Sequence, residues 1–193
     1  MLVGERMSKP VITISPDMPI SEALNLMKKE HIRRAPVVKD GKLAGIVSDK
    51  DLLNASPSPV TTLSIWEMNY LLSKVTVDQV MTNNVMTVTE DTPIEQAARI
   101  MADNKIGGLP VMRNGHVAGI ITETDLFKVF LELLGAREIG VRVTAQIDDT
   151  PGQLANITEA IAARKGNFVS FGQFTGDNPA HKILTFKVKG LTL

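Results

Sequence analysis

A seven-residue pattern occurs twice in this chain: residues 45–51 read GIVSDKD, and residues 119–125 read GIITETD. The similarity extends outward, so that residues 7–53 align without a gap on residues 81–127 at an offset of 81 − 7 = 74, and about a third of the aligned positions are identical. An internal duplication constrains the fold strongly, because each copy has to form the same supersecondary unit. The chain is therefore expected to contain two similar units in tandem.

The repeated pattern predicts a strand that runs into a helix, because a short β-branched run is followed by a hydroxyl residue and, three positions later, by an aspartate. Two interpretations fit. In the first, Ser48 or Thr122 caps the helix and Asp51 or Asp125 completes a capping box. In the second, the amides and the hydroxyl face the phosphate of a phosphorylated sugar, and the carboxylate accepts hydrogen bonds from the ribose. The seven residues alone leave both open.

The rest of each copy predicts a fixed order of elements. An extended segment, 11–15 or 85–89, leads into a helix that begins near a proline. A hairpin follows, with its turn at Asp-Gly 40–41 or Asn-Gly 114–115, dipeptides that favour a tight two-residue turn. Residues 92–95 (TPIE) also predict a capping box in the second copy, so its first helix is expected to start more firmly than that of the first copy. Each copy is expected to be strand, helix, strand, strand, helix.

This arrangement resembles the CBS domain, and two copies in tandem resemble the Bateman module that senses adenine nucleotides. The resemblance covers residues 7 to 134 and rests on the order of elements and on two intact Gly-h-h-Ser/Thr-x-x-Asp segments. It implies an α/β (α+β) fold of two βαββα repeats with a nucleotide in the cleft between them. In that family the motif aspartate holds the ribose, and the motif hydroxyl and nearby basic residues hold the phosphates. The resemblance therefore favours the ligand-binding interpretation of the motif.

The resemblance also implies one site for each motif, with the segment before the hairpin proline and the opening strand as further walls. The candidate nucleotide-binding residues are, in the first copy, Ile12, Ile32, Arg33, Arg34, Pro36, Ser48, Lys50 and Asp51, and, in the second copy, Met86, Ile106, Gly107, Gly108, Pro110, Thr122, Thr124 and Asp125.

The two expected sites differ in charge. Where the first copy has Arg33 and Arg34, the second has Gly107 and Gly108. Arginines there can form charge-assisted hydrogen bonds to a polyphosphate, or they can be solvated surface charges. Glycines offer a phosphate only backbone groups, but they let a ligand approach closely. Grouped by repeat, the arginines join Lys50 in a polyphosphate-preferring first site; alternatively, one of them reaches the second motif across the shared cleft.

The C-terminal part follows a different pattern. Residues 141–147 alternate as a half-buried strand, a turn at Asp149, Pro151 and Gly152 opens a helix, and two further strands follow within 168–174 and 184–189. Residues 138–190 resemble the start of an ACT domain, a ferredoxin-like βαββαβ fold. Here only βαββ is present, which would leave a sheet edge and one apolar face partly uncovered. Either the remainder lies outside this sequence or a partner covers that edge and face, and in both cases an intact effector site is in doubt.

These patterns divide the chain into repeat 1 at 1–54, a linker with an inserted helix at 55–76, repeat 2 at 77–135 and a partial ACT-like domain at 138–193. In the linker, Ser-Pro-Ser-Pro at 56–59 predicts an extended segment and residues 64–67 a capping box. Trp66 and Tyr70 would share one face of that helix, packing on the module or forming an oligomer contact. This organisation resembles the acetoin utilization protein family of bacteria, which is regarded as regulatory.

Composition excludes several classes of function. The 21 Lys and Arg residues balance the 21 Asp and Glu residues, so bulk charge favours neither nucleic acid nor an anionic membrane. There is no cysteine, and His31, His116 and His181 lack metal-ligand spacing. No phosphate loop or catalytic triad pattern occurs. We therefore expect a cytoplasmic, non-catalytic protein without a membrane span, a metal or a catalytic cofactor.

The leading hypothesis is a regulatory protein that binds ATP, ADP or AMP between the repeats and transmits binding to the ACT-like region or to a partner enzyme. The family resemblance also implies a homodimer formed through the CBS modules and the ACT-like region. Two alternatives remain: a structural dimerisation module with vestigial sites, and a sensor of another adenosyl ligand such as S-adenosylmethionine.

Overall fold

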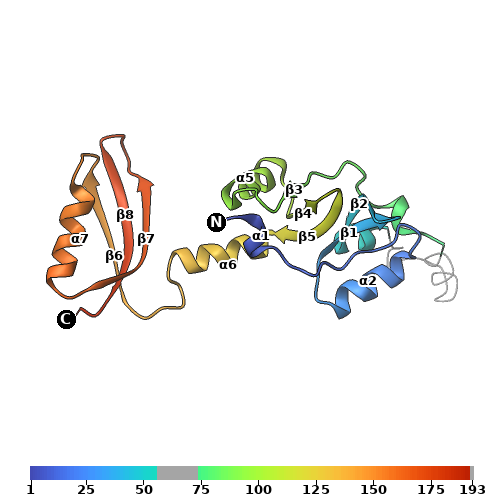
Figure 1. Cartoon of the computed structure of the whole chain (residues 1–193), viewed down its shortest axis with the longest axis horizontal. Coiled ribbons are helices and arrows are strands. Elements are labelled where there is room, and N and C mark those ends of the chain that lie inside the picture. The colour runs from blue at the N-terminus through green and yellow to red at the C-terminus, as the bar shows by residue number, and fades with distance from the viewer. Residues whose placement is uncertain (56–73, 192–193) are drawn as a thin grey trace. The chain divides into compact units, whose positions relative to one another are not determined.

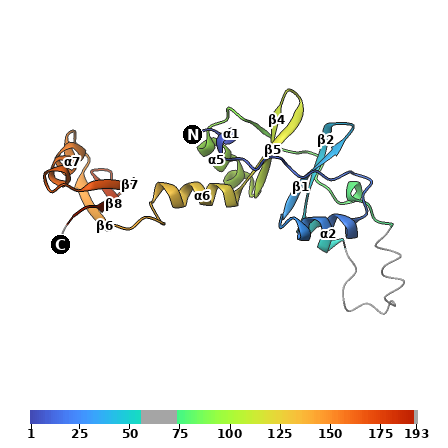
Figure 2. The same cartoon turned by 60° about the horizontal axis from the view of Figure 1, so that its bottom comes forward.

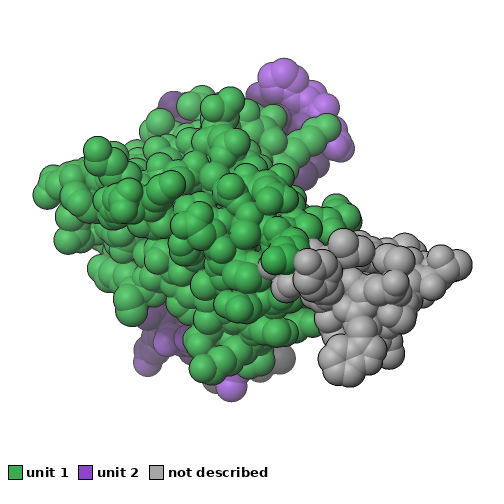
Figure 3. All heavy atoms as spheres, turned by 90° about the vertical axis from the view of Figure 1, so that its right-hand side faces the viewer, with its two compact units in different colours: residues 1–126 green, residues 127–193 purple. Residues whose placement is uncertain are grey.

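The computed structural model describes residues 1–55 and 74–191. It divides into two compact units, residues 1–126 and 127–193, which Figure 3 distinguishes by colour. The expected linker at 56–59 and the expected helix that carries Trp66 and Tyr70 lie outside the described residues.

The first unit contains both repeats, and the offset of 74 holds at the level of its elements. Its helices and strands are α1 Val3–Arg6, α2 Ile20–Lys29, β1 Arg34–Lys39, β2 Lys42–Ser48, α3 Asp49–Asn54, the 3-10 turn η1 Val77–Gln79, β3 Val88–Thr89, α5 Ile94–Asn104, β4 Gly108–Arg113, β5 His116–Thr122 and α6 Glu123–Leu133, which runs on into the second unit. The strands β4 and β5 begin and end 74 residues after β1 and β2, since 108 − 34 = 74 and 122 − 48 = 74. The predicted order of helix, strand, strand, helix is confirmed in both repeats.

Each repeat is built on one antiparallel hairpin, β1–β2 or β4–β5, and the two hairpins lie next to each other (Figures 1 and 2). The turn residues have the positive φ angles that the dipeptides predict: 50° at Asp40 and 74° at Gly41, 51° at Asn114 and 80° at Gly115. Both hairpins also carry a register shift at the same place, after Val37 and after Val111. The duplication therefore preserves even local irregularities of the backbone.

The opening strands and the helix starts differ from expectation. The first opening strand is reduced to a single bridge between Ile14 and Val37, and the second to the two residues of β3. The predicted capping box at 92–95 is wrong: Pro93 is the N-cap of α5, and the Thr92 hydroxyl instead accepts a hydrogen bond from the Thr89 amide at 3.1 Å. Because Pro19 begins α2 in the same way, the two helix starts are equivalent.

The leading segment of each repeat packs into the core of the other repeat. Val3 and Met7 belong to the cluster of buried residues around α5 and β4, whereas Val77 is buried in the cluster around α2 and β1. Two short bridges fix this exchange, Ser8 to Ile120 and Ile46 to Thr82. The sequence ranges 1–54 and 77–135 thus describe repeats in the chain, while each packed half contains a piece of both.

Two glycines of the repeated motif make the exchange possible. A Cβ on Gly45 would lie 2.5 Å from Met81 Sδ and 3.0 Å from the Thr82 carbonyl oxygen. A Cβ on Gly119 would lie at the same distances from Met7 Sδ and the Ser8 carbonyl oxygen. The motif glycine is therefore explained by close packing of the other repeat's leading segment.

The second unit is a three-stranded antiparallel sheet with one helix. Its elements are β6 Val141–Asp148, α7 Gln153–Ala163, β7 Asn167–Thr175 and β8 His181–Lys189, and the strand order is β6-β8-β7. The predicted βαββ order is confirmed. Ile157 and Ile161 of α7 pack on the buried side chains of β8, yet α7 has no buried residue and Phe171 of β7 is 38% exposed. One helix leaves the apolar face of this sheet partly uncovered, as expected.

Candidate functional site

The first motif forms a capping box at the start of α3. The Asp51 carboxylate accepts hydrogen bonds through Oδ2 from the Ser48 amide at 2.8 Å and from the Ser48 hydroxyl at 2.6 Å, and the Asp51 amide donates to Ser48 Oγ at 3.3 Å. Oδ1 of this half-buried carboxylate accepts no hydrogen bond from the described residues. The capping box thus uses one oxygen of the carboxylate, Oδ2.

The second motif has the same geometry at the start of α6. Asp125 Oδ2 accepts from the Thr122 amide at 3.0 Å and from the Thr122 hydroxyl at 2.7 Å. Asp125 is 5% exposed, whereas Asp51 is half-buried. The two carboxylates are therefore held alike but differ in how much solvent reaches them.

A pocket of about 460 Å³ lies against the first motif. Its wall combines Ser48 and Asp51 from the first repeat with residues of the second repeat's opening segment and pre-proline segment. The lining residues are Arg34, Ile46, Val47, Ser48, Asp51, Thr82, Asn84, Val85, Met86, Asn104, Lys105, Ile106, Gly107 and Gly108. The volume is within the range of about 300–1,000 Å³ that small-molecule sites occupy.

Arg34 crosses from the first repeat onto the glycine segment of the second. Its Nη1 donates to the Gly107 carbonyl oxygen at 2.5 Å. A Cβ on Gly107 would lie 2.5 Å from that nitrogen and 2.6 Å from Glu123 Oε2, and a Cβ on Gly108 would lie 2.9 Å from Arg34 Cδ. The glycines therefore admit the arginine side chain closely, and the guanidinium stands at the pocket wall.

Arg33 points to the second motif. Its Nη2 donates to Thr124 Oγ1 at 3.1 Å, across 91 residues of chain. The prediction that grouped the site residues by repeat placed Arg33 with Lys50, Ser48 and Asp51. In the structure Arg33 contacts Thr124 instead. The alternative, in which an arginine of the first repeat reaches the second motif, is the one observed. The physical reason is the exchange described above, since each pre-proline segment faces across to the other repeat.

The sequence-derived site residues fall into three groups. The pocket wall includes Arg34, Ser48, Asp51, Met86, Ile106, Gly107 and Gly108. Thr122, Thr124 and Asp125 lie at the second motif with Arg33. Pro36 and Pro110 are buried within β1 and β4, Ile12 and Ile32 are half-buried, and Lys50 is exposed on α3. None of these last five lines the described pocket.

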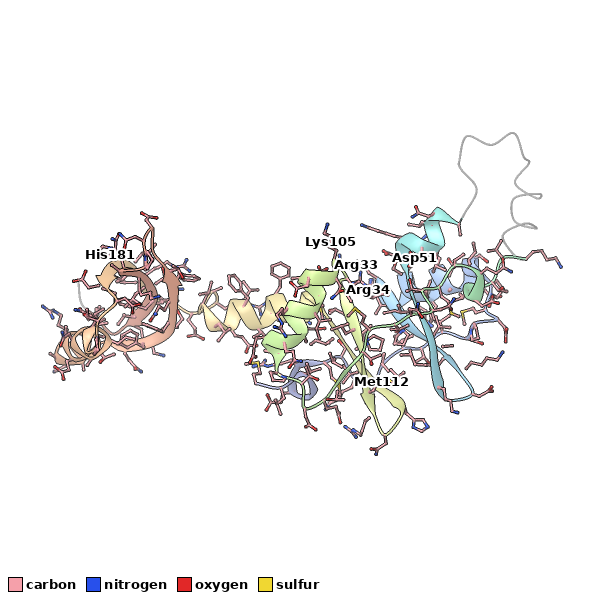
Figure 4. The ribbon with its side chains drawn as sticks, turned by 90° about the horizontal axis from the view of Figure 1, so that it is seen from above. Arg33, Arg34, Asp51, Lys105, Met112 and His181 are labelled. Carbon is pink, nitrogen blue, oxygen red and sulfur yellow. The ribbon has the colours of Figure 1, made fainter. Side chains whose placement is uncertain are left out.

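Sequence reasoning missed Lys105, which lines the pocket beside Asn104. Lys105 ends α5 in the left-handed conformation with φ of 54°, as His31 does 74 residues earlier. Lys105, Arg34 and Asp51, which all line the pocket, are labelled in Figure 4, as is Arg33. The matching backbone angle and the offset of 74 make His31 the counterpart of Lys105 in the first repeat.

Comparison with known proteins identifies the fold. The family model for the CBS domain matches residues 3–58 and 77–132, the two repeats. The chain belongs to the CBS domain family. A CBS domain-containing protein of Dictyostelium discoideum is 34% identical over 136 residues, which cover 69% of this chain and 94% of that protein. Other relatives are longer: the chain spans 47% of one from Methanocaldococcus jannaschii and under a quarter of two further archaeal proteins.

Two solved CBS structures cover the same part of the chain. The CBS domain pair of protein MJ0100, in complex with 5′-methylthioadenosine and S-adenosyl-L-methionine, has 32% identity and a TM-score of 0.57, and covers 72% of this chain and 98% of that one. A Vibrio cholerae protein assigned to acetoin utilization, AcuB, has 30% identity and a TM-score of 0.58, with 72% and 96% covered. The tandem CBS pair is thus shown by both sequence and structure.

In the parts of the chain that the structure describes, no group of three or more His, Asp or Glu side chains is placed to hold a metal ion. No helix in residues 1–55 and 74–191 combines the length and the apolar composition that a bilayer crossing requires.

Proposed function

We propose that this CBS pair is a non-catalytic regulatory module that binds an adenosyl ligand, with ATP, ADP and AMP as the favoured ligands. The observation that carries the proposal is the pocket that joins the first motif to the second repeat's glycine segment. It supplies a carboxylate for ribose hydroxyls, apolar walls at Val85 and Met86 for a base, and two cations, Arg34 and Lys105.

The second motif is proposed as a second site with a different charge. Each residue of the described pocket has a counterpart at an offset of 74: Asp125 for Asp51, Ile12 for Met86, Arg33 for Gly107 and His31 for Lys105. The hydrogen bond from Arg33 to Thr124 supports this arrangement. Arginine suits bidentate phosphate binding, so we propose that the second motif prefers a polyphosphate.

A thermal-shift and calorimetric titration tests the proposal. A ligand that binds only the folded state adds about 2.7 kcal/mol of stability at a hundredfold excess over its dissociation constant, so the melting temperature should rise with millimolar ATP, ADP or AMP. If the melting temperature rises only with S-adenosylmethionine, the ligand is another adenosyl compound and not a nucleotide. Absence of a shift and of heat with all four would leave the structural dimerisation module.

We also propose a role for the second unit and a downstream target. The strand order of the second unit fits the first three strands of a ferredoxin-like fold, which supports a partial ACT-like domain that receives the signal. The similarity to the Vibrio cholerae protein supports a role in acetoin metabolism through a partner enzyme. Deleting the gene in its own organism should then impair growth on acetoin.

A further inference from the structure

The carbonyl oxygen of Gly107 is shared by the two proposed sites. It accepts a hydrogen bond from Arg34 Nη1 at 2.5 Å, and Arg34 lines the pocket of the first motif. It also accepts from the backbone amide of Glu123 at 3.2 Å, and Glu123 is the first residue of α6, between Thr122 and Asp125 of the second motif. A carbonyl oxygen has two lone pairs, so it can accept from both donors at once. One atom therefore connects the wall of the first site to the helix start of the second.

Arg34 holds the segment that carries this oxygen. Gly107 and Gly108 are consecutive glycines, and glycine has the greatest backbone freedom of any residue. The Arg34 side chain occupies the space where their Cβ atoms would lie, since a Cβ on Gly108 would be 2.9 Å from Arg34 Cδ. The guanidinium thus fixes the position of the two glycines and, through the shared oxygen, of the first residue of α6.

The first repeat has the same backbone hydrogen bond without the arginine. There the Asp49 amide donates to the Arg33 carbonyl oxygen at 3.0 Å, and this pair lies 74 positions before the one described above. The residue equivalent to Arg34 is Gly108, which has no side chain that could donate to that oxygen. An arginine of the first site therefore holds the second, and the second site has no equivalent side chain to hold the first.

We propose that Arg34 couples the two sites negatively, an inference that rests on the proposed function of both motifs. A phosphate is charged and can accept two parallel hydrogen bonds from a guanidinium, whereas the Gly107 carbonyl oxygen is neutral and accepts one from Arg34. A phosphorylated ligand in the first pocket therefore takes the guanidinium away from Gly107. The glycine segment and the start of α6 then lose a fixed position, so that Thr122 and Asp125 bind a second ligand more weakly.

Calorimetric titration with AMP measures the coupling. Asp51→Ala leaves the second motif and Asp125→Ala leaves the first, so each chain gives the affinity of one uncoupled site. In the wild-type chain the second AMP should bind about tenfold more weakly than these affinities predict, a factor within the usual range of about 5–150-fold. Adenosine has no phosphate that could take Arg34, so its two binding steps should be independent. A wild-type AMP isotherm equal to the sum of the two single-site isotherms would overturn the proposal.

Variants of Arg34 test the residue itself. In the Asp51→Ala chain, Arg34→Met removes the hydrogen bond to Gly107 and should weaken AMP binding at the second motif about tenfold, although Arg34 lines the other pocket. Arg34→Lys can still donate to the carbonyl oxygen and should restore part of that affinity. In an otherwise wild-type chain, Arg34→Met should make the two AMP binding steps independent, which a general loss of stability would not do.

Lys39→Met is the charge-matched control, because it removes a cation from the other end of β1. It should leave the affinity of the second motif unchanged in the Asp51→Ala chain. If Arg34→Met weakens that affinity no more than Lys39→Met does, the coupling is wrong and nucleotide binding stands. If the wild-type chain gives no heat with AMP, ADP, ATP or S-adenosylmethionine, the proposed function fails and the coupling fails with it.

Discussion

The second repeat reaches the first motif with Gly107 and Gly108, and the first repeat reaches the second motif with Arg33. The backbone around them is alike: each motif aspartate accepts hydrogen bonds from the Ser or Thr three residues earlier, and each motif glycine admits the other repeat's leading methionine. The difference lies in the side chains that cross. Arg34 lies on the Gly107 carbonyl group, and Arg33 lies on Thr124. The packing is thus the same in the two halves, whereas the charge of the residues beside each motif differs.

The largest expected effect at each site comes from its motif aspartate. Asp51→Ala and Asp125→Ala should each weaken adenosyl-ligand binding at the altered motif by about 10- to 100-fold, because a lost hydrogen bond to a charged group costs about 1.5–3 kcal/mol and 1.4 kcal/mol is tenfold. Calorimetry measures this loss. Asp51→Asn and Asp125→Asn serve as size-matched controls.

The Asp51→Ala and Asp125→Ala variants should also differ in their free energy of unfolding. Asp125 is buried and accepts two hydrogen bonds from Thr122, so its loss should lower the free energy of unfolding by about 1–3 kcal/mol. Asp51 is half-buried, and its loss should cost about 1 kcal/mol, as for an ordinary cap. Urea unfolding measures both. If both variants lose stability but bind the ligand as before, the two motifs serve only as capping boxes.

The motif glycines test whether the two halves are packed alike. Gly45→Ala and Gly119→Ala each place a Cβ 2.5 Å from a methionine sulfur and 3.0 Å from a backbone oxygen. Each should lower the free energy of unfolding by about 1–3 kcal/mol, the usual cost of overpacking. Urea unfolding of the two variants should give nearly equal losses. A loss confined to one of them would show that the exchange of leading segments supports only half of the module.

The crossing arginines should have a smaller effect on ligand choice. In an Asp51→Ala background, which leaves the second motif, Arg33→Ala should reduce the preference for ATP over AMP by about tenfold, and more at low salt, because exposed charges are then less screened. Arg33→Lys keeps a charge and should retain part of the preference. If ATP and AMP lose affinity equally, Arg33 is a surface charge that does not read phosphate number.

Arg34→Ala is the matched variant for the first motif. Because Arg34 holds the Gly107 segment as well as lining the pocket, its loss should weaken ATP and AMP together in an Asp125→Ala background. Isothermal titration with both nucleotides checks this. A selective loss of affinity for ATP would mean that Arg34 has the role proposed for Arg33.

The smallest expected effect comes from a surface ion pair that only the second repeat has. Arg113 binds Glu90 through two hydrogen bonds, while the equivalent positions in the first repeat are Pro16 and Lys39. The Arg113 guanidinium lowers the pKa of Glu90 below its ordinary value, chiefly through these hydrogen bonds. The stabilisation is therefore present above the unfolded-state pKa of about 4.3 and is lost as the pH falls through the lowered folded-state pKa.

Glu90→Gln removes the pH-dependent part of that pair. The variant should be slightly less stable than the wild type at pH 7, and the gap should close in acid. Unfolding curves of both proteins at several pH values between about 2 and 7 check this. A gap that stays constant down to the lowest pH would mean that the pair contributes nothing through ionisation.

Much of the fold follows from the sequence alone, because it depends on short-range chemistry. The Asp-Gly and Asn-Gly turns fix two hairpins, the repeated Ser/Thr and Asp fix two capped helices, and alternation fixes the strands of the second unit. Because the two repeats align at an offset of 74, an element predicted in one repeat is also predicted at the equivalent residues of the other. The capping box at 92–95 failed for an equally local reason, since Pro93 is the N-cap and the Thr92 hydroxyl accepts from the Thr89 amide instead.

What only the tertiary structure decided is which repeat supplies which wall of the site. Arg34 and Gly107 are 73 residues apart, and Arg33 and Thr124 are 91 apart, so no periodicity or turn signal connects them. Their pairing follows from leading segments that pack in the opposite core, with Val3 buried in the second half and Val77 in the first. Such an exchange depends on how two whole surfaces fit, and a duplicated sequence fits either arrangement equally well until the halves are packed together.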